Sequence, residues 1–400
     1  MNVERHTTPL PQLTGDVAAL TAPVMGVKPG YKQTAVGVIP EEWEVKPLAD
    51  VVDFLDGRRR PVKDSDRAKM RGDIPYYGAS GIVDYVNAFL FDEDLILLGE
   101  DGENILSRNC RLAFKISGKT WVNNHAHVLR PKPGMSLDYV AEFLESRDYV
   151  QYNTGTAQPK LNKSVCSKIP VLCPPAPEQR AIAGAMSDVD ALLGGLDRLI
   201  AKKRDLKQAA MQQLLTGKTR LPGFKGEWAA KRLGDVVEIT KGELITEKDA
   251  LPGNIPVIAG GKKPSYFHSR PNRSGKTVTI SGSGANAGYV AIYERPIFAS
   301  DCSTICEGRD YSIEFIYFLL QIRQDEIYKA QTGGAQPHIH PSDLRPLMVD
   351  IPSVKEQIAI AAALSDMDAE LAALTQRRDK TRALKQGMMQ ELLTGRTRLV

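Results

Sequence analysis

A long internal duplication is the feature that most constrains how this chain can fold. The segment that begins at Glu178 recurs from Glu356, and both copies run without a gap to a Leu-Leu-Thr-Gly ending at Gly217 and Gly395. Roughly 25 of about 44 aligned positions are identical, far beyond chance. The same offset relates two upstream hexapeptides, Thr154–Pro159 and Thr332–Pro337. Because little else upstream aligns, the repeated unit is a variable domain followed by a near-constant segment.

The constant segments predict two long helices. Pro177 and Glu178 are typical of a helix start, and the glycines at the two Leu-Leu-Thr-Gly endings are typical of helix stops. Apolar residues recur every seven positions in two rows, four and three residues apart, which is the pattern of a coiled-coil seam. The rows are Ile182, Val189, Leu196 and Met186, Leu193, Ile200 in the first copy, and Ile360, Met367, Leu374 and Leu364, Leu371 in the second. We expect the phase to slip near Lys202 and to resume through Leu206, Ala210 and Leu214; two ordinary amphipathic core helices remain the alternative.

Connectivity predicts how these helices are arranged. A helix of about 37 residues spans roughly 55 Å. One variable domain precedes the first helix and the other follows its end, so the second helix must run back antiparallel to the first. Two domains about 50 Å apart and related by a pseudo-twofold axis would match roughly 15 base pairs of DNA. That geometry suits a split DNA site with an unread spacer.

The variable domains predict compact α+β folds. Short β-rich runs (94–98 and 276–280) alternate with turn residues and with helices over 137–146 and 313–324. We therefore predict an α+β chain in which two globular α/β domains are separated by two long helices that form an antiparallel, pseudo-twofold coiled coil. The expected bounds are a flexible tail 1–26, a first variable domain 27–174, a first helix 175–217, a second variable domain 218–352, and a second helix with the C-terminus 353–400.

Loop residues of both variable domains suggest DNA contact. A net charge of +4 permits a nucleic-acid partner without demanding one. Clustered loop cations suit phosphate contact and guanine reading, although solvated charged loops are the alternative. These cations are Arg58, Arg59, Arg60, Lys63, Arg67 and Lys69 in the first domain, and Lys262, Lys263, Arg270, Arg273 and Lys276 in the second. Further candidates for base edges or phosphates are Tyr76, Tyr77, Ser80, Asn123, Asn124, Ser283 and Asn286.

Several stretches resemble catalytic or metal-binding motifs, but each lacks a residue or a spacing that the motif requires. The stretch 270–277 ends like a phosphate-binding loop but begins with arginine instead of glycine, and 281–288 lacks a following helix for a dinucleotide site. The spacing of two cysteines and two histidines fits no common zinc module, and His125 and His127 alternate on a strand-like run, which favours structural roles. The acidic turn 99–103 is explained equally well by capping of backbone amides. The sequence therefore predicts no catalytic residue and no metal site. The cysteines and histidines considered for zinc are Cys302, Cys306, His338 and His340.

The composition indicates the cellular compartment in which the chain is expected. Five cysteines form no CxxC pair and leave one over, which favours a reducing cytoplasm over a disulfide framework. No apolar run reaches about 18 residues, so a membrane-spanning helix is not expected. The first 29 residues show no secretory signal pattern.

The repeated residues also carry a family resemblance. From about Val27 onward the chain resembles the specificity subunit of type I restriction–modification systems. The resemblance rests on Thr154–Leu161, Pro174–Gln179, Gly37–Trp43, Ile74–Gly78, Val122–His127 and the Leu-Leu-Thr-Gly helix ends. It implies that each variable domain is a target-recognition domain that reads one half of a bipartite double-stranded DNA sequence. The two helices would then pack as an antiparallel coiled coil that sets the spacer.

The same resemblance implies partners and cofactors. Two methyltransferase subunits would dock on the helices and restriction subunits would join them, so S-adenosylmethionine and ATP would bind to the partners and no cofactor to this chain. The helix cations expected at the partner interface are Lys202, Lys203, Arg204, Lys207, Arg378, Lys380, Arg382 and Lys385. Lys160 and His338, at equivalent positions of the loops 158–162 and 336–340, are further expected DNA contacts. The replacement of lysine by histidine is a departure between the copies, so the basic side chains of the two loops would reach DNA differently.

Three other interpretations stay open. The chain could be the specificity subunit of a related system whose single partner both methylates and cleaves. It could be a DNA-modifying enzyme by itself, although it lacks the Asn/Asp-Pro-Pro-Tyr/Phe methylation motif. It could also be a coiled-coil scaffold without a DNA role.

Overall fold

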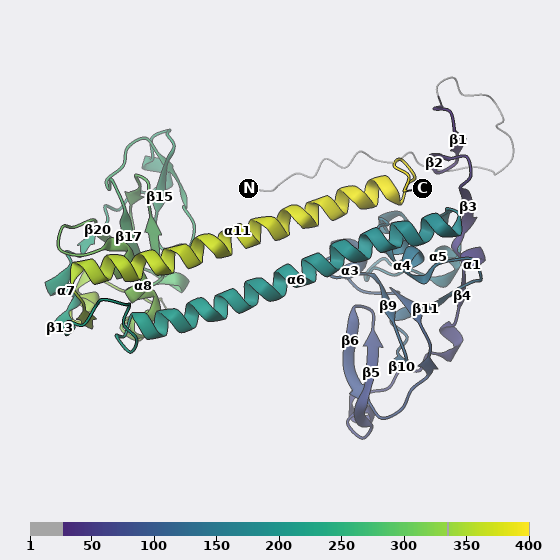
Figure 1. The fold of residues 1–400 in the computed structure, drawn as a ribbon, viewed down its shortest axis with the longest axis horizontal. Helices are drawn as coiled ribbons and strands as arrows, with labels where there is room; N and C mark the ends of the chain where they lie inside the picture. Colours follow the sequence, from purple (N-terminus) through teal and green to yellow (C-terminus); the bar gives the residue numbers. More distant parts are fainter. Residues whose placement is uncertain (1–26, 334–335, 400) are drawn as a thin grey trace. The chain divides into compact units, whose positions relative to one another are not determined.

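The chain divides into two compact units, each with its own sheets and core. The computed structural model describes residues 27–333 and 336–399, so the predicted tail at 1–26 lies outside the described residues. Unit 1 holds the described residues up to Ala191 together with those from Arg382 onward, and unit 2 runs from Leu192 to Thr381. Each unit thus combines one variable domain with part of each long helix (Figure 1).

Unit 1 is built on two four-stranded sheets. Their strand orders are β6-β5-β10-β7 and β4-β11-β8-β9, and two-stranded pairs β1-β2 and β12-β3 flank them. The strands are β1 Tyr31–Thr34, β2 Gly37–Pro40, β3 Glu44–Pro47, β4 Val52–Phe54, β5 Arg71–Gly78, β6 Gly81–Val86, β7 Phe91–Asp92, β8 Leu95–Gly99, β9 Ala113–Ile116, β10 Lys119–Val122, β11 Ala126–Pro131 and β12 Pro170–Cys173. The short helices are α1 Leu48–Val51, α2 Asp64–Arg67, α3 Asn104–Ser107, α4 Leu137–Glu145 and α5 Lys163–Cys166, with 3-10 turns at Asp56–Arg58 and Val150–Tyr152.

Unit 2 has a similar but smaller set of sheets. A four-stranded sheet of order β14-β20-β17-β18 stands with a three-stranded sheet β16-β15-β19 and the pair β13-β21. The strands are β13 Ala229–Arg232, β14 Thr240–Lys241, β15 Ile255–Ile258, β16 Tyr266–His268, β17 Thr277–Ser281, β18 Val290–Tyr293, β19 Phe298–Ala299, β20 Cys302–Cys306 and β21 Met348–Ile351. The helices are α7 Leu233–Val236, α8 Ile313–Ile322, α9 Gln324–Lys329 and α10 Pro341–Leu344, with 3-10 turns at Glu247–Asp249 and Gly284–Asn286.

The apolar runs that predicted strands form the centre of each unit. All five residues of β8 and of β17 are buried, so both strands are covered on both faces. The run of β8 is continuously apolar, as expected of such a strand, whereas β17 also buries Thr277, Thr279 and Ser281. Serine N-caps start the helix beside each sheet: Ser136 accepts from the Tyr139 amide in α4, and Ser312 accepts from the Phe315 amide in α8. The helix expected over 313–324 ends at Ile322, because Arg323 leaves helical geometry with ψ 16° and α9 follows it.

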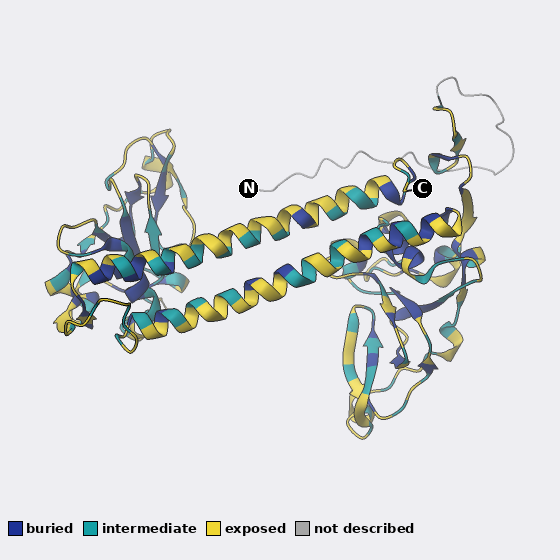
Figure 2. Cartoon of the chain, viewed as in Figure 1, coloured by how far each residue is buried: buried dark blue, intermediate teal, exposed yellow. Residues whose placement is uncertain are grey.

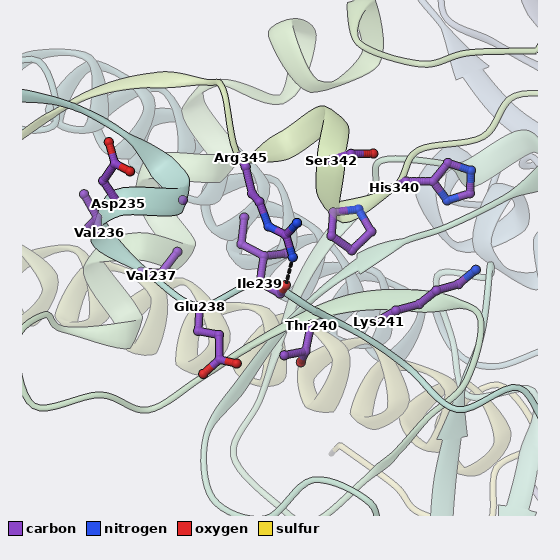
Figure 3. Close-up of a pocket in the computed structure, with 12 residues that line it drawn as sticks. Asp235, Val236, Val237, Glu238, Ile239, Thr240, Lys241, His340, Ser342 and Arg345 are labelled. Carbon is purple, nitrogen blue, oxygen red and sulfur yellow. Dashed lines mark hydrogen bonds between the residues drawn. The ribbon is translucent and has the colours of Figure 1, made fainter.

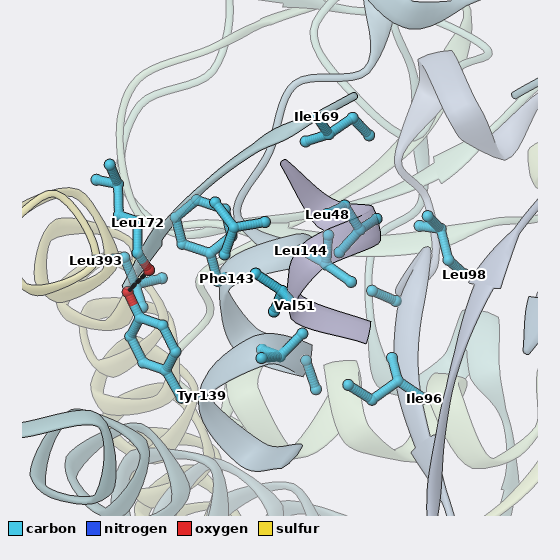
Figure 4. Packing of buried hydrophobic residues seen from close by; sticks show 14 of the residues in the cluster. Leu48, Val51, Ile96, Leu98, Tyr139, Phe143, Leu144, Ile169, Leu172 and Leu393 are labelled. Atoms are coloured by element: carbon cyan, nitrogen blue, oxygen red, sulfur yellow. Dashed lines mark hydrogen bonds between the residues drawn. The ribbon is translucent and has the colours of Figure 1, made fainter. Parts of the chain in front are cut away.

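The core of unit 1 includes the end of the chain. Leu48, Leu98 and Leu144 pack with Leu393, which follows the last long helix, in one buried cluster (Figure 4). The Tyr139 hydroxyl is buried in that cluster and donates to the Leu172 carbonyl at 2.8 Å. Residues from both ends of the sequence are therefore needed to complete this core.

The two constant segments are uninterrupted helices. The first, α6, spans Ala176–Leu214 and the second, α11, spans Val354–Leu392, each 39 residues long, or about 58 Å of helix. Gly217 and Gly395 have φ values of 67° and 72°, the left-handed geometry expected of glycines that stop a helix. Long stretches of both helices are exposed to solvent (Figure 2).

The expected phase slip in the first helix is wrong. The two rows continue at spacing seven from Leu196 and Ile200 to Lys203 and Lys207, which are only partly exposed, whereas Leu206 is 47 % exposed. Lysines can occupy the seam because α11 supplies Glu370 and Asp368 as partners for them. An apolar pattern alone does not reveal such positions.

The long helices were also compared with what a membrane-spanning helix requires. Within residues 27–333 and 336–399, no helix is both long enough and apolar enough to cross a bilayer.

Candidate nucleic-acid interface

Loops from distant parts of the sequence meet at one edge of unit 1. The Leu161 amide donates to the Glu100 carbonyl at 2.7 Å, and the Glu100 amide donates to the His125 carbonyl at 2.8 Å. The Asn123 amide reaches the Tyr77 carbonyl at 3.0 Å, which adds the end of β5 to the group. These backbone bonds bring together the ends of β5, β8 and β10 and the loop 154–161.

The glycine of the duplicated hexapeptide is needed for the shape of its loop. A Cβ on Gly155 would lie 1.8 Å from the Gln158 carbonyl oxygen, so no larger residue fits without movement of the loop. Its counterpart Gly333 has φ 84°, the left-handed region that favours glycine. The motif therefore repeats for a structural reason, although residues 334–335 of the second copy lie outside the described part of the chain.

A buried, charged histidine ties this loop to the sheet of unit 1. The His127 side chain is 1 % exposed, and its Nδ1 lies 2.8 Å from the Asp56 carboxylate while its Nε2 lies 2.7 Å from the Leu161 carbonyl. Burial opposes a positive charge there, but the interactions with Asp56 and Cys166 together outweigh it and raise the pKa of His127 to about 10. Both ring nitrogens can therefore donate, and the structural role predicted for this histidine is confirmed.

The acidic turn after β8 does not cap backbone amides as expected. The Glu100 carboxylate pairs with Arg59 at 2.6 Å and lies 3.6 Å from Lys160, while Asp101 pairs with the His125 imidazole at 2.9 Å. Side chains of neighbouring loops, and not backbone amides, are therefore the partners of both carboxylates. Lys160 and His125 nevertheless stay about half exposed at this edge of the unit.

The predicted contact residues of unit 1 fall into two groups. Arg59 and Asn123 are largely buried and bonded within the domain, as is Tyr76, so they are available to a ligand only if these bonds break. The exposed residues at the loop edge are Arg60, Ser80, Asn124, His125 and Lys160. Tyr77 is half-buried. Among the remaining predicted cations, Arg58 pairs with Glu93, Arg67 with Asp64 and Asp84, and Lys69 with Asp66, and Lys63 is exposed.

Unit 2 repeats the backbone of this edge with different side chains. The Ile339 amide donates to the Gly282 carbonyl at 2.9 Å, which is the counterpart of the bond between Leu161 and Glu100. The Ser283 hydroxyl bonds to Asp301, and the His338 ring stacks on His340 with 6.3 Å between centroids. The same framework thus presents serine, aspartate and histidines where unit 1 presents acids, asparagine and lysine.

The predicted cations of unit 2 are also divided. Arg273 is committed to the fold, because it donates to Thr304 Oγ1 at 2.9 Å and to the Lys241 carbonyl at 3.1 Å. Lys276 pairs with Glu314 at 2.5 Å. Lys262, Lys263 and Arg270 are exposed, and Asn286 is half-buried. Lys262 lies 5.4 Å from the Tyr289 ring centroid, and Arg270 lies 3.9 Å from Glu243.

An open pocket of about 760 Å³ lies beside the His340 end of this edge. Figure 3 shows residues 235–241 on one side and His340, Ser342 and Arg345 on the other. Arg345 donates to the Ile239 carbonyl at 3.1 Å, so it is held as part of the wall. The pocket mixes acidic and basic side chains without a group that suits one kind of small ligand.

The described residues contain no group of three or more His, Cys, Asp or Glu side chains arranged to hold a metal ion. Cys302 lies in β20, where burial raises the pKa of its thiol to about 12.

Half of the helix cations expected at a partner interface join α6 to α11 instead. Lys203 pairs with Glu370, Lys207 with Asp368, Arg378 with Asp197 and Lys385 with Asp190, at 2.6, 2.6, 3.7 and 2.7 Å. Each of these pairs lies within one unit, and within each unit the two helices run antiparallel. The remaining predicted cations, Lys202, Arg204, Lys380 and Arg382, are exposed.

An arginine that follows each long helix forms an ion pair with a buried glutamate, a contact that was not predicted from the sequence; these two arginines are called the clamp arginines. Arg220 donates to Glu356 through two bonds of 2.6 Å in unit 2, and Arg398 donates to Glu178 at 2.5 Å in unit 1. Both glutamates are buried, and Glu178 also accepts from the Trp43 indole at 2.8 Å. The signal was present, because the two copies continue as Thr-Arg-Leu after the helix ends.

Comparison with known proteins shows what this duplicated architecture belongs to. The family described as "Type I restriction modification DNA specificity domain" matches residues 40–201 and again 225–382. A relative from Haemophilus influenzae that carries the name of a type I restriction enzyme specificity subunit is 26 % identical over 82 % of this chain and 88 % of its own length. The MjaVIII specificity subunit of Methanocaldococcus jannaschii is 23 % identical over 90 % of this chain and 94 % of its own length.

The fold is that of solved proteins of the same class. The crystal structure of a type I restriction–modification S subunit from M. genitalium aligns with a TM-score of 0.65, covering 88 % of this chain and 96 % of that one at 16 % identity. The two units with their repeated loop edge therefore define a DNA-specificity protein. The chain belongs to the type I restriction–modification DNA specificity family, and its role is sequence recognition, not catalysis.

Proposed function

We propose that the chain reads a bipartite double-stranded DNA target, with one half-site for the loop edge of each unit. The observation that carries this proposal is the repeated backbone framework with different side chains at its surface. Unit 1 presents Asn124, His125 and Lys160, which are exposed, whereas unit 2 presents Asp301 and His338, which are partly exposed. A fixed framework with changed side chains is what two different base sequences require, because base edges are read by side-chain donors and acceptors.

The two long helices set the unread gap between the half-sites. This part of the proposal is supported by the heptad rows and by the antiparallel ion pairs inside each unit. The equivalent contacts in the two units favour a pseudo-twofold relation, in which the domains 27–174 and 218–352 act as target-recognition domains and the helices 175–217 and 353–400 form an antiparallel coiled coil.

The assembly that uses this specificity contains other subunits. We place two methyltransferase subunits on the exposed faces of the helices, with restriction subunits joining them, and we assign S-adenosylmethionine and ATP to those partners. A solved structure titled for complex assembly of the type I restriction–modification system shares the fold at a TM-score of 0.53, which is consistent with assembly into a multi-subunit complex. The five unpaired thiols fit the cytoplasm as the compartment of this complex.

Mapping of methylated bases in host DNA tests the proposal. Deletion of the gene should remove one bipartite adenine-methylated motif from the genome. Substitution of His125 and Lys160 by alanine should then alter one half-site, and substitution of His338 should alter the other. Lys115→Ala, an exposed lysine of β9 that is not a predicted DNA contact, is the control and should leave the motif intact. Equal changes in both half-sites from either domain would contradict a two-reader mechanism.

A further inference from the structure

Lys207 and Lys385 occupy equivalent positions of the two heptad seams, in rows whose other members are mostly apolar. Lys207 lies seven residues after Ile200 on α6, and Lys385 lies seven residues before Leu392 on α11. Their side chains are only 15 % and 12 % exposed. Two ammonium groups are therefore largely withdrawn from water in the helix pair.

Each of these lysines is paired with an aspartate of the other helix. Lys207 Nζ lies 2.6 and 2.7 Å from the two carboxylate oxygens of Asp368, and Lys385 Nζ lies 2.8 and 2.7 Å from those of Asp190. The duplication relates Lys207 to Lys385 and Asp190 to Asp368. The same two-oxygen contact thus forms twice, once in each unit, from equivalent residues.

Each lysine also lies beside a helix of the variable domain in its own unit. Lys385 reaches the Glu142 carboxylate of α4 at 3.2 Å, and Glu142 is itself buried. Lys207 lies 5.2 Å from the centroid of the Phe318 ring of α8. The lysine therefore stands where α6, α11 and a helix of the variable domain meet, and a shift of one long helix along the other would break both sets of contacts.

Stability alone does not account for charges at this place. Apolar residues of similar size in a buried seam are often at least as stable as an ion pair, because the pair must lose its hydration. Polar seam residues instead select one alignment of the helices, since every other alignment leaves a charge facing apolar side chains. We propose that Lys207–Asp368 and Lys385–Asp190 are positioning pairs that select the register of α6 against α11 and seat each variable domain on it. This inference rests on the proposed role of the helices as the spacer.

The first test measures the register in the full-length protein. Lys207→Met with Asp368→Leu makes the seam apolar, and Lys207→Asp with Asp368→Lys exchanges the charges. Lys203→Met with Glu370→Leu is the matched control, because that pair also joins the helices but its lysine is more exposed, at 30 % against 15 % for Lys207. The two acids are similarly exposed, at 47 % and 44 %. In a Cys110→Ser background, a short bismaleimide linker reports the native register through Asp197→Cys with Arg378→Cys. It reports a shift of one heptad through Asp197→Cys with Leu371→Cys.

The apolar variant should keep its thermal midpoint within a few degrees while the shifted cross-link rises at least tenfold. The charge exchange and the control should give the native cross-link alone. Native cross-linking alone in the apolar variant would overturn the inference. A loss of the folded transition in both the apolar and exchanged variants would also overturn it, because the pair would then serve stability.

The second readout separates this inference from the proposed function. If the helices set the spacer, methylation mapping of cells with the apolar variant should show the same half-sites with more than one gap length, or with at least tenfold less methylation at the original gap. A shifted cross-link with one unchanged gap would leave the register inference standing and would refute the spacer role of the helices.

Discussion

At the residue scale, unit 1 buries the positively charged imidazole of His127, which is only 1 % exposed. His127 holds its proton because Asp56 lies beside Nδ1 and the Leu161 carbonyl lies beside Nε2. Its pKa is raised from 6.5 to about 10, so the folded state binds the proton more tightly than the unfolded state does. Such a group stabilises the fold fully below pH 6.5, and its contribution is lost as the pH rises through 10.

Replacement of this histidine should remove a pH-dependent part of the stability. We expect His127→Gln to lower the free energy of unfolding at pH 6 by a few kcal/mol, because a pKa difference of this size between the folded and unfolded states corresponds to a free energy of that order. Denaturant titrations at pH 6, 8 and 9.5 would measure it. The difference between the wild type and the variant should shrink as the pH rises, and a constant difference would show that His127 is neutral in the fold. His125→Gln is the control, since that imidazole is half exposed.

The clamp arginines provide a second prediction at this scale. Arg398→Met would leave the carboxylate of Glu178, which is 0 % exposed, with the Trp43 indole as its one remaining side-chain partner among residues 27–333 and 336–399. An unpaired buried charge of this kind costs about 3–5 kcal/mol, so chemical denaturation should show a large loss of stability. Arg396→Met, an exposed arginine two residues away, should change little. Glu178→Gln combined with Arg398→Met should recover part of the loss, because the buried charge is then absent.

At the scale of elements, the two long helices differ in their glycine content. Gly184 and Gly195 of α6 correspond to Ala362 and Ala373 of α11. A Cβ at either glycine would meet nothing within 4 Å, so the smaller residue is not required by packing. The first helix is therefore less stable than its counterpart at these two positions.

Alanine at these positions should stabilise the chain. Gly184→Ala and Gly195→Ala should each add about 0.5–1 kcal/mol, because glycine loses more backbone entropy than alanine in a helix. A rise in the thermal midpoint would confirm it. Gly155→Ala, where the Cβ would meet the Gln158 carbonyl, should lower recognition of one half-site, and a neutral effect there would show that the loop adapts.

At the scale of the whole molecule, the proposed spacer can be lengthened without loss of the seam. Seven residues inserted between Asp190 and Asp197 of α6, and seven between Arg378 and Lys385 of α11, keep the heptad phase. The insertion adds about 10.5 Å, or roughly three base pairs, to the unread gap. Methylation mapping would read the new gap directly. An unchanged gap would refute the spacer role, and four-residue insertions, which break the phase, serve as the comparison.

The sequence by itself determined the duplication, the two long helices and the class of protein. These features depend on local periodicity and repetition: heptads from Ile182 onward, glycines at 217 and 395, and two copies of one hexapeptide. Such signals are carried by residues close together in the chain, so no tertiary information is needed to detect them.

The tertiary structure decided which polar residues face a ligand and which hold the fold. Arg59 and Arg60 are neighbours with the same chemistry, yet Arg59 is bound to Glu100 and Arg60 is exposed. The sequence predicts Lys207 to be a surface charge for partner binding, whereas the structure pairs it with Asp368, which is far away in sequence. A side chain's partner is set by contacts between distant segments, and those contacts arise only when the whole chain packs.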